Sequence, residues 1–270
     1  MSLVYAGFTL FHLRRAAVEP AVRQAALDLL CSPHWGGELR YFASVATAGH
    51  RSWRRPGMVS AKTLRQTADE ALQADSVASF TMATAGQNGP GYRSVTFTRV
   101  AQRSPFSISY GERPAADHDA DAWVAAVVAF FDRIDGQTGV VAVMASDDEI
   151  ASECGEGGVS RNDRLVHPFP DQHARTRGAN RRQIGTRYMR FPRWGTLVSH
   201  DHVGELGGVE AIARAVEPAV VRPLAGGVYF QLTATVASAM SDEAAARQAA
   251  FTTFAAPLLP PPVTPPGGSV

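Results

Sequence analysis

Three β-strand patterns follow one another along the chain with no helical pattern between them. They cover residues 77–84, 92–100 and 106–110, and in the third apolar residues alternate with serines. The first two are joined by Gly-Gln-Asn-Gly-Pro-Gly at 86–91, whose residues favour tight turns. Adjacent strands joined by short turns must pair antiparallel, because a parallel pair needs a long crossover connection. The pattern therefore favours a mixed or antiparallel sheet.

Helical patterns lie on both sides of these strands. Glu19-Pro20 opens one helix, since proline suits the first helical turn, and Ser60 can cap a second. The strongest helical pattern spans 117–136, with a wide apolar face, and Ser241 can cap a last helix. Helices interspersed with runs of adjacent strands predict an α+β fold. We expect a single large domain at residues 1–256, which could consist of two α+β halves.

The C-terminal third predicts short strands at 188–191 and 194–199, helical turns at 203–206 and 209–216, and a strand hairpin over 220–232 with glycines at its bend. Two other segments lack such periodicity. Residues 155–185 are rich in arginine and are expected to form a loop or an insertion. Residues 257–270 hold six of the 17 prolines and are expected to form an extended, disordered tail.

The overall charge hides two opposite blocks. The 270 residues carry 26 basic and 25 acidic side chains, a net charge of +1 that argues against a general polyanion binder. Residues 112–156, however, carry a local charge of −9, and residues 161–193 carry +7. These blocks either pair with each other in the fold or meet a charged partner. Two cysteines exclude a disulfide scaffold and a Cys-based zinc site, and with no signal sequence or membrane span evident, we expect a cytoplasmic location.

No recognised catalytic frame occurs in the sequence. It has no nucleophile elbow, no His-Glu-x-x-His, no phosphate-binding loop and no dinucleotide fingerprint. Carboxylates flank Cys154, which should raise the pKa of its thiol and make it a poor nucleophile. We therefore expect no catalytic residue, no metal and no cofactor.

Two segments keep other functions open. If the strand at 194–199 continued, His200 and His202 could face one side and bind a metal, as in a small hydrolase or metal-dependent enzyme. A helix start capped by Ser199 or Asp201 is the favoured interpretation. The Arg-rich segment with nearby aromatics suggests nucleic-acid binding. Those aromatics, however, fall where strands begin and are more simply explained as core residues.

Three C-terminal segments carry a family resemblance. They are Phe191-Pro-Arg-Trp-Gly-Thr-Leu-Val-Ser199, His202-Val-Gly-Glu-Leu-Gly-Gly208 and Val221-Arg-Pro-Leu-Ala-Gly-Gly-Val-Tyr-Phe-Gln-Leu232. Together they resemble the C-terminal half of polymorphic-toxin immunity proteins, namely the type VI secretion immunity family and its relative encoded beside restriction-endonuclease-fold toxins. Ser52-Trp53, and residues 80–97, resemble the N-terminal half more weakly.

The resemblance implies a non-catalytic inhibitor that binds a cognate secreted bacterial toxin, with a nuclease as one candidate toxin. A nuclease has a basic substrate groove, which a carboxylate-rich surface could occupy. We therefore expect the acidic block to supply toxin-facing charges, although its first three carboxylates also suit a helix N-terminus. The candidates are Asp117, Asp119, Asp121, Asp147, Asp148, Glu149 and Glu153.

Overall fold

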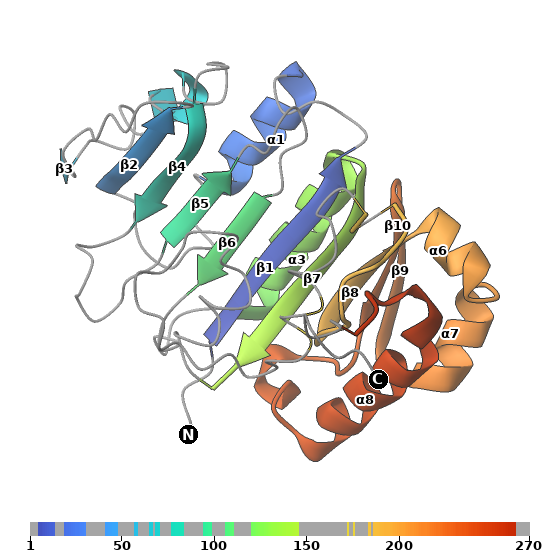
Figure 1. Cartoon of the computed structure of the whole chain (residues 1–270). Helices are drawn as coiled ribbons and strands as arrows, with labels where there is room; N and C mark the ends of the chain where they lie inside the picture. The colour runs from blue at the N-terminus through green and yellow to red at the C-terminus, as the bar shows by residue number, and fades with distance from the viewer. Residues whose placement is uncertain are drawn as a thin grey trace, which may run out of the picture.

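The computed structural model describes residues 5–13, 19–30, 41–47, 57–58, 65–66, 68–70, 77–83, 94–98, 106–110, 120–145, 172, 175, 183–184 and 186–262. Within these ranges an antiparallel sheet packs against several helices, so the predicted α+β class is confirmed (Figure 1). No helix among the described residues is long and apolar enough to cross a membrane.

The described strands form one ten-stranded sheet, in the order β3-β2-β4-β5-β6-β1-β7-β8-β10-β9. All neighbouring strands run antiparallel, including the expected β4-β5-β6 meander. The strands are β1 Tyr5–Leu13, β2 Tyr41–Thr47, β3 Gly57–Met58, β4 Val77–Ala83, β5 Ser94–Thr98, β6 Phe106–Tyr110, β7 Gly136–Met144, β8 Gly195–Ser199, β9 Val220–Leu224 and β10 Gly227–Gln231.

The first strand of the chain lies in the middle of the sheet. β1 pairs with β6 on one side and with β7 on the other, and the β1–β7 ladder runs from Tyr5↔Met144 to Leu13↔Gly136. This long ladder joins the strands of the N-terminal half to those of the C-terminal half. Two helices, α1 (Pro20–Leu30) and α3 (Ala120–Arg133), lie behind the sheet in Figure 1.

An aromatic cluster holds α3 against β1. Phe8 is fully buried and meets the Phe131 ring edge-on, with the ring centroids 5.3 Å apart. The rings of Trp123 and Phe130 also lie within 6.3 Å of Phe8. Aromatic pairs in this geometry add to the free energy of burial, because the edge of one ring is attracted to the face of the other. The apolar face predicted for this helix therefore points into the core.

A carboxylate links three helical segments outside this core. Asp28 of α1 accepts hydrogen bonds from Arg133 at the end of α3 (3.0 Å), from Arg65 (3.1 Å) and from Gln24 (2.6 Å). Partial burial raises the pKa of Asp28, but these hydrogen bonds outweigh burial and hold the pKa below its ordinary value. Because the groups remain well exposed, the cluster orients the helices more than it stabilises the fold.

Three helices lie beside the part of the sheet that is formed by β8, β10 and β9 (Figure 1). They are α6 (His200–Glu205), α7 (Val209–Val216) and α8 (Asp242–Phe254), and a 3₁₀ turn, η2 (Val236–Ser238), precedes α8. Phe251 of α8 packs edge-on against Phe230 of β10, with centroids 5.8 Å apart. Every residue of β8 and β10 is buried, so both faces of these strands are covered.

Two expectations for the C-terminal third need correction. No strand forms at 188–191; Tyr188 makes a single bridge to Ile184, and the chain then runs irregularly to β8. The predicted start of the disordered tail, residue 257, is also wrong. The 3₁₀ turn η3 (Ala256–Leu258) forms there, and Leu258 and Leu259 are buried. The Leu258 carbonyl also accepts the Met189 N–H at 2.9 Å. Apolar side chains among the prolines let this part of the tail join the core, and residues 263–270 lie outside the described residues.

Candidate functional site

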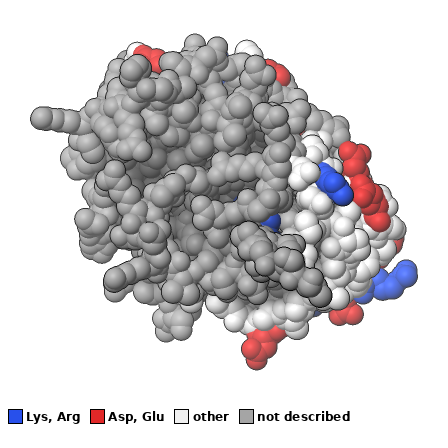
Figure 2. Space-filling model, in the orientation of Figure 1, with Lys and Arg blue, Asp and Glu red and all other residues white. Residues whose placement is uncertain are grey.

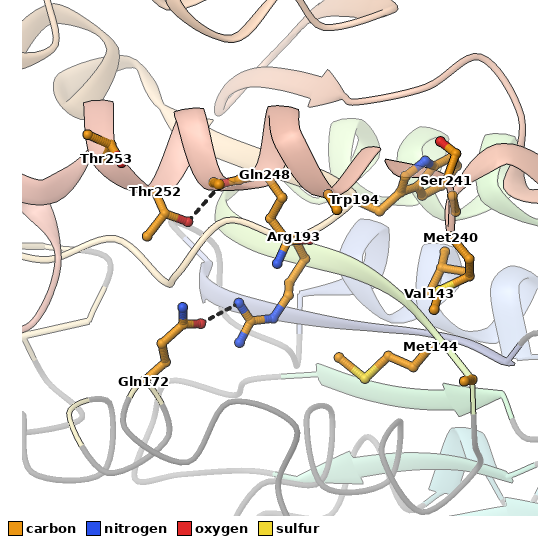
Figure 3. A pocket seen from close by; sticks show the side chains of 14 residues that line it. Val143, Met144, Gln172, Arg193, Trp194, Met240, Ser241, Gln248, Thr252 and Thr253 are labelled. Carbon is orange, nitrogen blue, oxygen red and sulfur yellow. Dashed lines mark hydrogen bonds between the residues drawn. The ribbon is translucent and has the colours of Figure 1, made fainter. Parts of the chain in front are cut away.

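A groove of about 640 Å³ lies between α8, the end of β7 and the residues that enter β8 (Figure 3). This volume falls in the range of ligand-binding pockets, and its described lining is mostly apolar with a few polar groups. The described lining residues are Val143, Met144, Ala145, Gln172, Arg193, Trp194, Ala239, Met240, Ser241, Ala245, Gln248, Ala249, Thr252 and Thr253.

One wall of the groove is a face of α8 that carries alanine, threonine and glutamine side chains. The helix starts at the predicted cap, Ser241, whose Oγ accepts the Ala244 N–H at 3.2 Å. Ala245, Ala249 and Thr252 recur three or four residues apart, so they share one face and line the groove. Phe251 is turned into the core instead. Because Ala245 and Ala249 are small, a bound molecule can approach the helix backbone closely at these two positions.

The other wall is built by Arg193 and Trp194, just before β8. Trp194 is 2% exposed, and its indole Nε1 donates to Thr233 Oγ1 at 2.7 Å. Arg193 is 3% exposed, and its guanidinium donates to Gln172 Oε1 at 2.8 Å and to the Pro192 carbonyl at 3.1 Å. Thr196 Oγ1 accepts the Arg193 N–H at 3.0 Å, which fixes the backbone of this turn. The groove thus has a rigid, buried cation at its edge.

Met240 stands beside this wall and is unusually exposed. Its 52% exposed fraction contrasts with the buried apolar residues around it, and of the described large apolar residues only Val221 is also exposed. The described lining contains hydroxyl, amide and guanidinium groups but no histidine, cysteine or carboxylate. These groups can bind a ligand by hydrogen bonding, charge and apolar contact.

The two histidines of the possible metal site diverge in the structure. The strand ends at Ser199 and α6 begins at His200, which is exposed, whereas His202 is 1% exposed. Ser199 Oγ accepts the His202 N–H at 3.2 Å, so the predicted helix cap is confirmed for Ser199. Within the described part of the chain no group of three metal-ligating side chains occurs.

The His202 ring should make stability depend on pH. Burial lowers the pKa of His202, and its effect exceeds the opposite effects of Glu205, Asp201 and a backbone hydrogen bond to Thr186. The unfolded chain therefore takes up this proton more readily than the folded chain, so stability is lost as pH falls below about 6.5, the ordinary histidine pKa. Urea unfolding at pH 7.5 and 5.5 should show a smaller loss for His202→Leu than for the wild type.

His200→Gln is the control for this prediction, because His200 is exposed on the same helix. It should retain the wild-type loss of stability between the two pH values. An equal loss in the wild type and in His202→Leu would show that the buried imidazole does not govern this pH dependence.

Asp121 has a structural contact in the fold. It lies in the first turn of α3, and its Oδ1 accepts the Val236 N–H at 2.7 Å, which ties α3 to η2. Its toxin-facing role stays a prediction, and the described surface around α6, α7 and α8 carries only scattered charges in Figure 2. Outside the described residues lie the other predicted toxin-facing acids, Asp117, Asp119, Asp147, Asp148, Glu149 and Glu153.

Removing the Asp121 tie should destabilise the protein moderately. Asp121→Ala leaves the Val236 N–H without its acceptor, and we expect a loss of about 1–2 kcal/mol in the free energy of unfolding. Asp121→Asn keeps an oxygen acceptor and should lose less than half of that. Urea denaturation of the two variants measures the difference; equal stability of Asp121→Ala and the wild type would show that the contact contributes nothing.

The described arginines of the Arg-rich region are engaged within the fold. Arg175 donates from Nε to the Pro260 carbonyl at 2.7 Å and stacks over the Phe191 ring, 4.8 Å from its centroid. Arg187 lies 5.2 Å from the Tyr188 ring centroid. Phe191 is buried, as expected for a core aromatic. The other residues of 155–185, apart from Gln172, Gln183 and Ile184, lie outside the described residues.

Sequence reasoning did not find the groove. Its α8 wall reads as an alanine-rich helix with no chemistry-bearing side chain, and Met240 stands in no motif. In the sequence, Trp194 belongs to the family resemblance and Arg193 to the basic block, and neither pattern indicates a groove. Only the packing of α8 beside β7 and β8 brings these residues together.

No protein-family model and no curated protein matches the chain. Among solved structures, it is similar to one from Pseudomonas aeruginosa, the T6SS protein PA0821, with a TM-score of 0.58 and 14% sequence identity. The alignment covers 95% of this chain and 73% of the other. At this identity the likeness concerns the fold, and the shared fold extends over nearly the whole chain.

Proposed function

We propose that this chain is an immunity protein associated with type VI secretion, which binds a cognate secreted toxin and neutralises it in the cytoplasm. The observation that carries the proposal is the fold shared with a Pseudomonas aeruginosa T6SS protein over 95% of the chain. The resemblance noted in the C-terminal sequence points to the same class of system.

The residues behind that resemblance support a binding role through the architecture they build. Trp194 lies just before β8 and lines the groove, and the Gly207-Gly208 pair separates α6 from α7. The β9–β10 hairpin follows, with Ala225 and Gly226 at its bend. A rigid sheet that carries an apolar groove with one buried cation is suited to tight binding of another protein, in which a few buried anchors supply most of the free energy.

Co-expression with the neighbouring toxin gene tests the proposal. Cells that produce the polypeptide encoded beside this chain should stop growing, and this chain should restore growth, whereas it should not protect against an unrelated toxin. Purified together, the two proteins should elute as one complex. A toxic neighbour that this chain neither binds nor counteracts would contradict the proposed function.

A further inference from the structure

We infer that Met240 is a site of reversible oxidation, at which a peroxide converts the thioether to a sulfoxide while the fold stays intact. The inference goes beyond the proposed function and does not depend on it. Three observations carry it: the exposure of Met240, the burial of two other described methionines, and the position of Met240 in a turn beside the groove.

Met240 is far more accessible than the other methionines whose exposure the structure describes. It is 52% exposed, whereas Met144 is 5% exposed and Met189 is 1% exposed. A peroxide must reach the sulfur atom to react, so a buried methionine reacts only when the structure around it opens. The three thioethers have the same intrinsic chemistry, and the fold therefore decides which of them is oxidised first.

The reaction needs a peroxide but no catalytic base from the protein. A lone pair on the neutral Met240 sulfur attacks one oxygen of hydrogen peroxide, and the S–O bond forms as the O–O bond breaks. The hydroxide that leaves takes the proton of the new S–OH group, so the products are the sulfoxide and water. Sulfur loses two electrons and hydrogen peroxide gains them. Sulfoxide reductases return methionine sulfoxide to the thioether, so the change is reversible.

The place of Met240 in the chain lets the fold accept the sulfoxide. Met240 lies in the turn between η2 and α8, directly before Ser241, the N-cap of α8. The cap hydrogen bond joins Ser241 Oγ to the Ala244 N–H and does not involve the Met240 side chain. Water can hydrate a sulfoxide oxygen on an exposed side chain, so oxidation buries no polar group without a partner.

Oxidation at this position changes the chemistry of the groove. Met240 lines the groove together with Val143 and Met144 (Figure 3), and it is the exposed large apolar residue of the described lining. A sulfoxide is polar and accepts hydrogen bonds, whereas the thioether is apolar and flexible. A peroxide therefore replaces an apolar side chain at the groove by a polar one.

Mass spectrometry of the full-length protein treated with hydrogen peroxide tests the inference. The reaction is run in native buffer and in urea, and fragmentation of the peptides locates each added oxygen on Met240, Met144 or Met189. Trypsin releases Met240 in a peptide that contains no cysteine and no other methionine. Met240→Leu is the control variant, because it removes the thioether and keeps an apolar side chain of similar size.

In native buffer Met240 should be oxidised at least about 10-fold faster than Met144 and Met189, and in urea the three rates should agree within about 3-fold. Met240→Leu should abolish the fast native reaction and leave the slow ones unchanged. The protein oxidised at Met240 should unfold thermally within about 2 °C of the reduced protein. Methionine sulfoxide reductases of both stereospecificities, supplied together, should remove the added oxygen.

Several results would overturn the inference. Equal native rates for Met240 and the two buried methionines would show that the fold does not select the site. Slow oxidation of Met240 in native buffer and fast oxidation in urea would show that its sulfur is shielded. Unfolding that accompanies oxidation of Met240 would show that the fold does not accept the sulfoxide, and an oxygen that the reductases leave in place would exclude reversibility. None of these measurements uses the toxin, so the proposed function is tested separately.

Discussion

Gly227→Ala is expected to lower the free energy of unfolding by about 3 kcal/mol. Gly227 begins β10 and pairs with Ser199 of β8. A Cβ at this position would lie 2.1 Å from the Val198 carbonyl oxygen and 2.8 Å from its carbonyl carbon. These are backbone atoms of a buried strand, so no flexible side chain can move aside. The β8–β10 ladder must open instead, and urea denaturation measures the loss.

Gly204→Ala is the control, because it makes the same chemical change in a position with room. Among the described residues, nothing beyond the chain neighbours and the helix's own backbone lies within 4 Å of the added Cβ, and Gly204 is an exposed residue of α6. Alanine restricts the unfolded chain more than glycine does, so this variant should gain about 0.5 kcal/mol. A Gly227→Ala protein as stable as the wild type would show that the two strands do not approach as closely as described.

Trp194→Ala should cost about 3–5 kcal/mol, the usual range for truncating a buried tryptophan. The side chain is 2% exposed, and its backbone carbonyl accepts the Leu232 N–H at 2.9 Å, where the chain leaves β10. Truncation leaves a cavity beside the groove and leaves Thr233 Oγ1 without the indole donor. Thermal and urea unfolding should both show the loss.

Thr233→Val separates the two contributions. It keeps the volume of the side chain but leaves the Trp194 indole without its acceptor, and it should cost about 1–2 kcal/mol. The difference between the losses of unfolding free energy in Trp194→Ala and in Thr233→Val then measures the contribution of Trp194 packing. If Thr233→Val and Trp194→Ala were equally destabilising, the hydrogen bond and not the packing would hold this wall.

The glycines in the resembling segments are explained by backbone geometry. Gly207 and Gly208 have φ values of 85° and 95°, a region that other residues rarely adopt. A Cβ on Gly226 would lie 2.1 Å from the Gly136 carbonyl oxygen, and one on Gly195 would lie 2.2 Å from the Tyr229 hydroxyl. These positions therefore specify how the C-terminal part of the sheet packs, and their pattern reports the fold more directly than a binding site.

Local signals predicted most of the elements correctly. The alternation of apolar residues and serines over 106–110 predicted strand β6, and the apolar face after Asp117 predicted helix α3. The sequence predicts Ser241 as one helix cap and Ser199 or Asp201 as another, and the structure confirms Ser241 and Ser199. These predictions are possible because a cap acts on an N–H only three residues away. The glycines between 220 and 232 marked the β9–β10 hairpin for the same local reason.

Contacts between distant residues were beyond local signals. The sequence at Tyr188 is typical of the start of a strand. Within the described part of the chain, however, its strand pairing is a single bridge to Ile184, because strand formation needs a partner ladder. Leu258 and Leu259 stand in a proline-rich tail and are nevertheless buried, since the core offers them a site. The groove depends on the position of α8 beside Trp194, which no period or cap in either segment encodes.

Interactions within a few residues explain what the sequence predicts here, namely most of the helices and strands, the helix caps and the tight turns. The sequence limits the sheet to a mixed or antiparallel one, and only the structure shows that the described strands all pair antiparallel. The tertiary structure alone decided that β1 sits between β6 and β7, that His202 is buried while His200 is exposed, and that Arg193, Met240 and the small face of α8 form one groove. These features arise from packing between residues far apart in the chain, where many arrangements satisfy the same local pattern and only the complete core selects one.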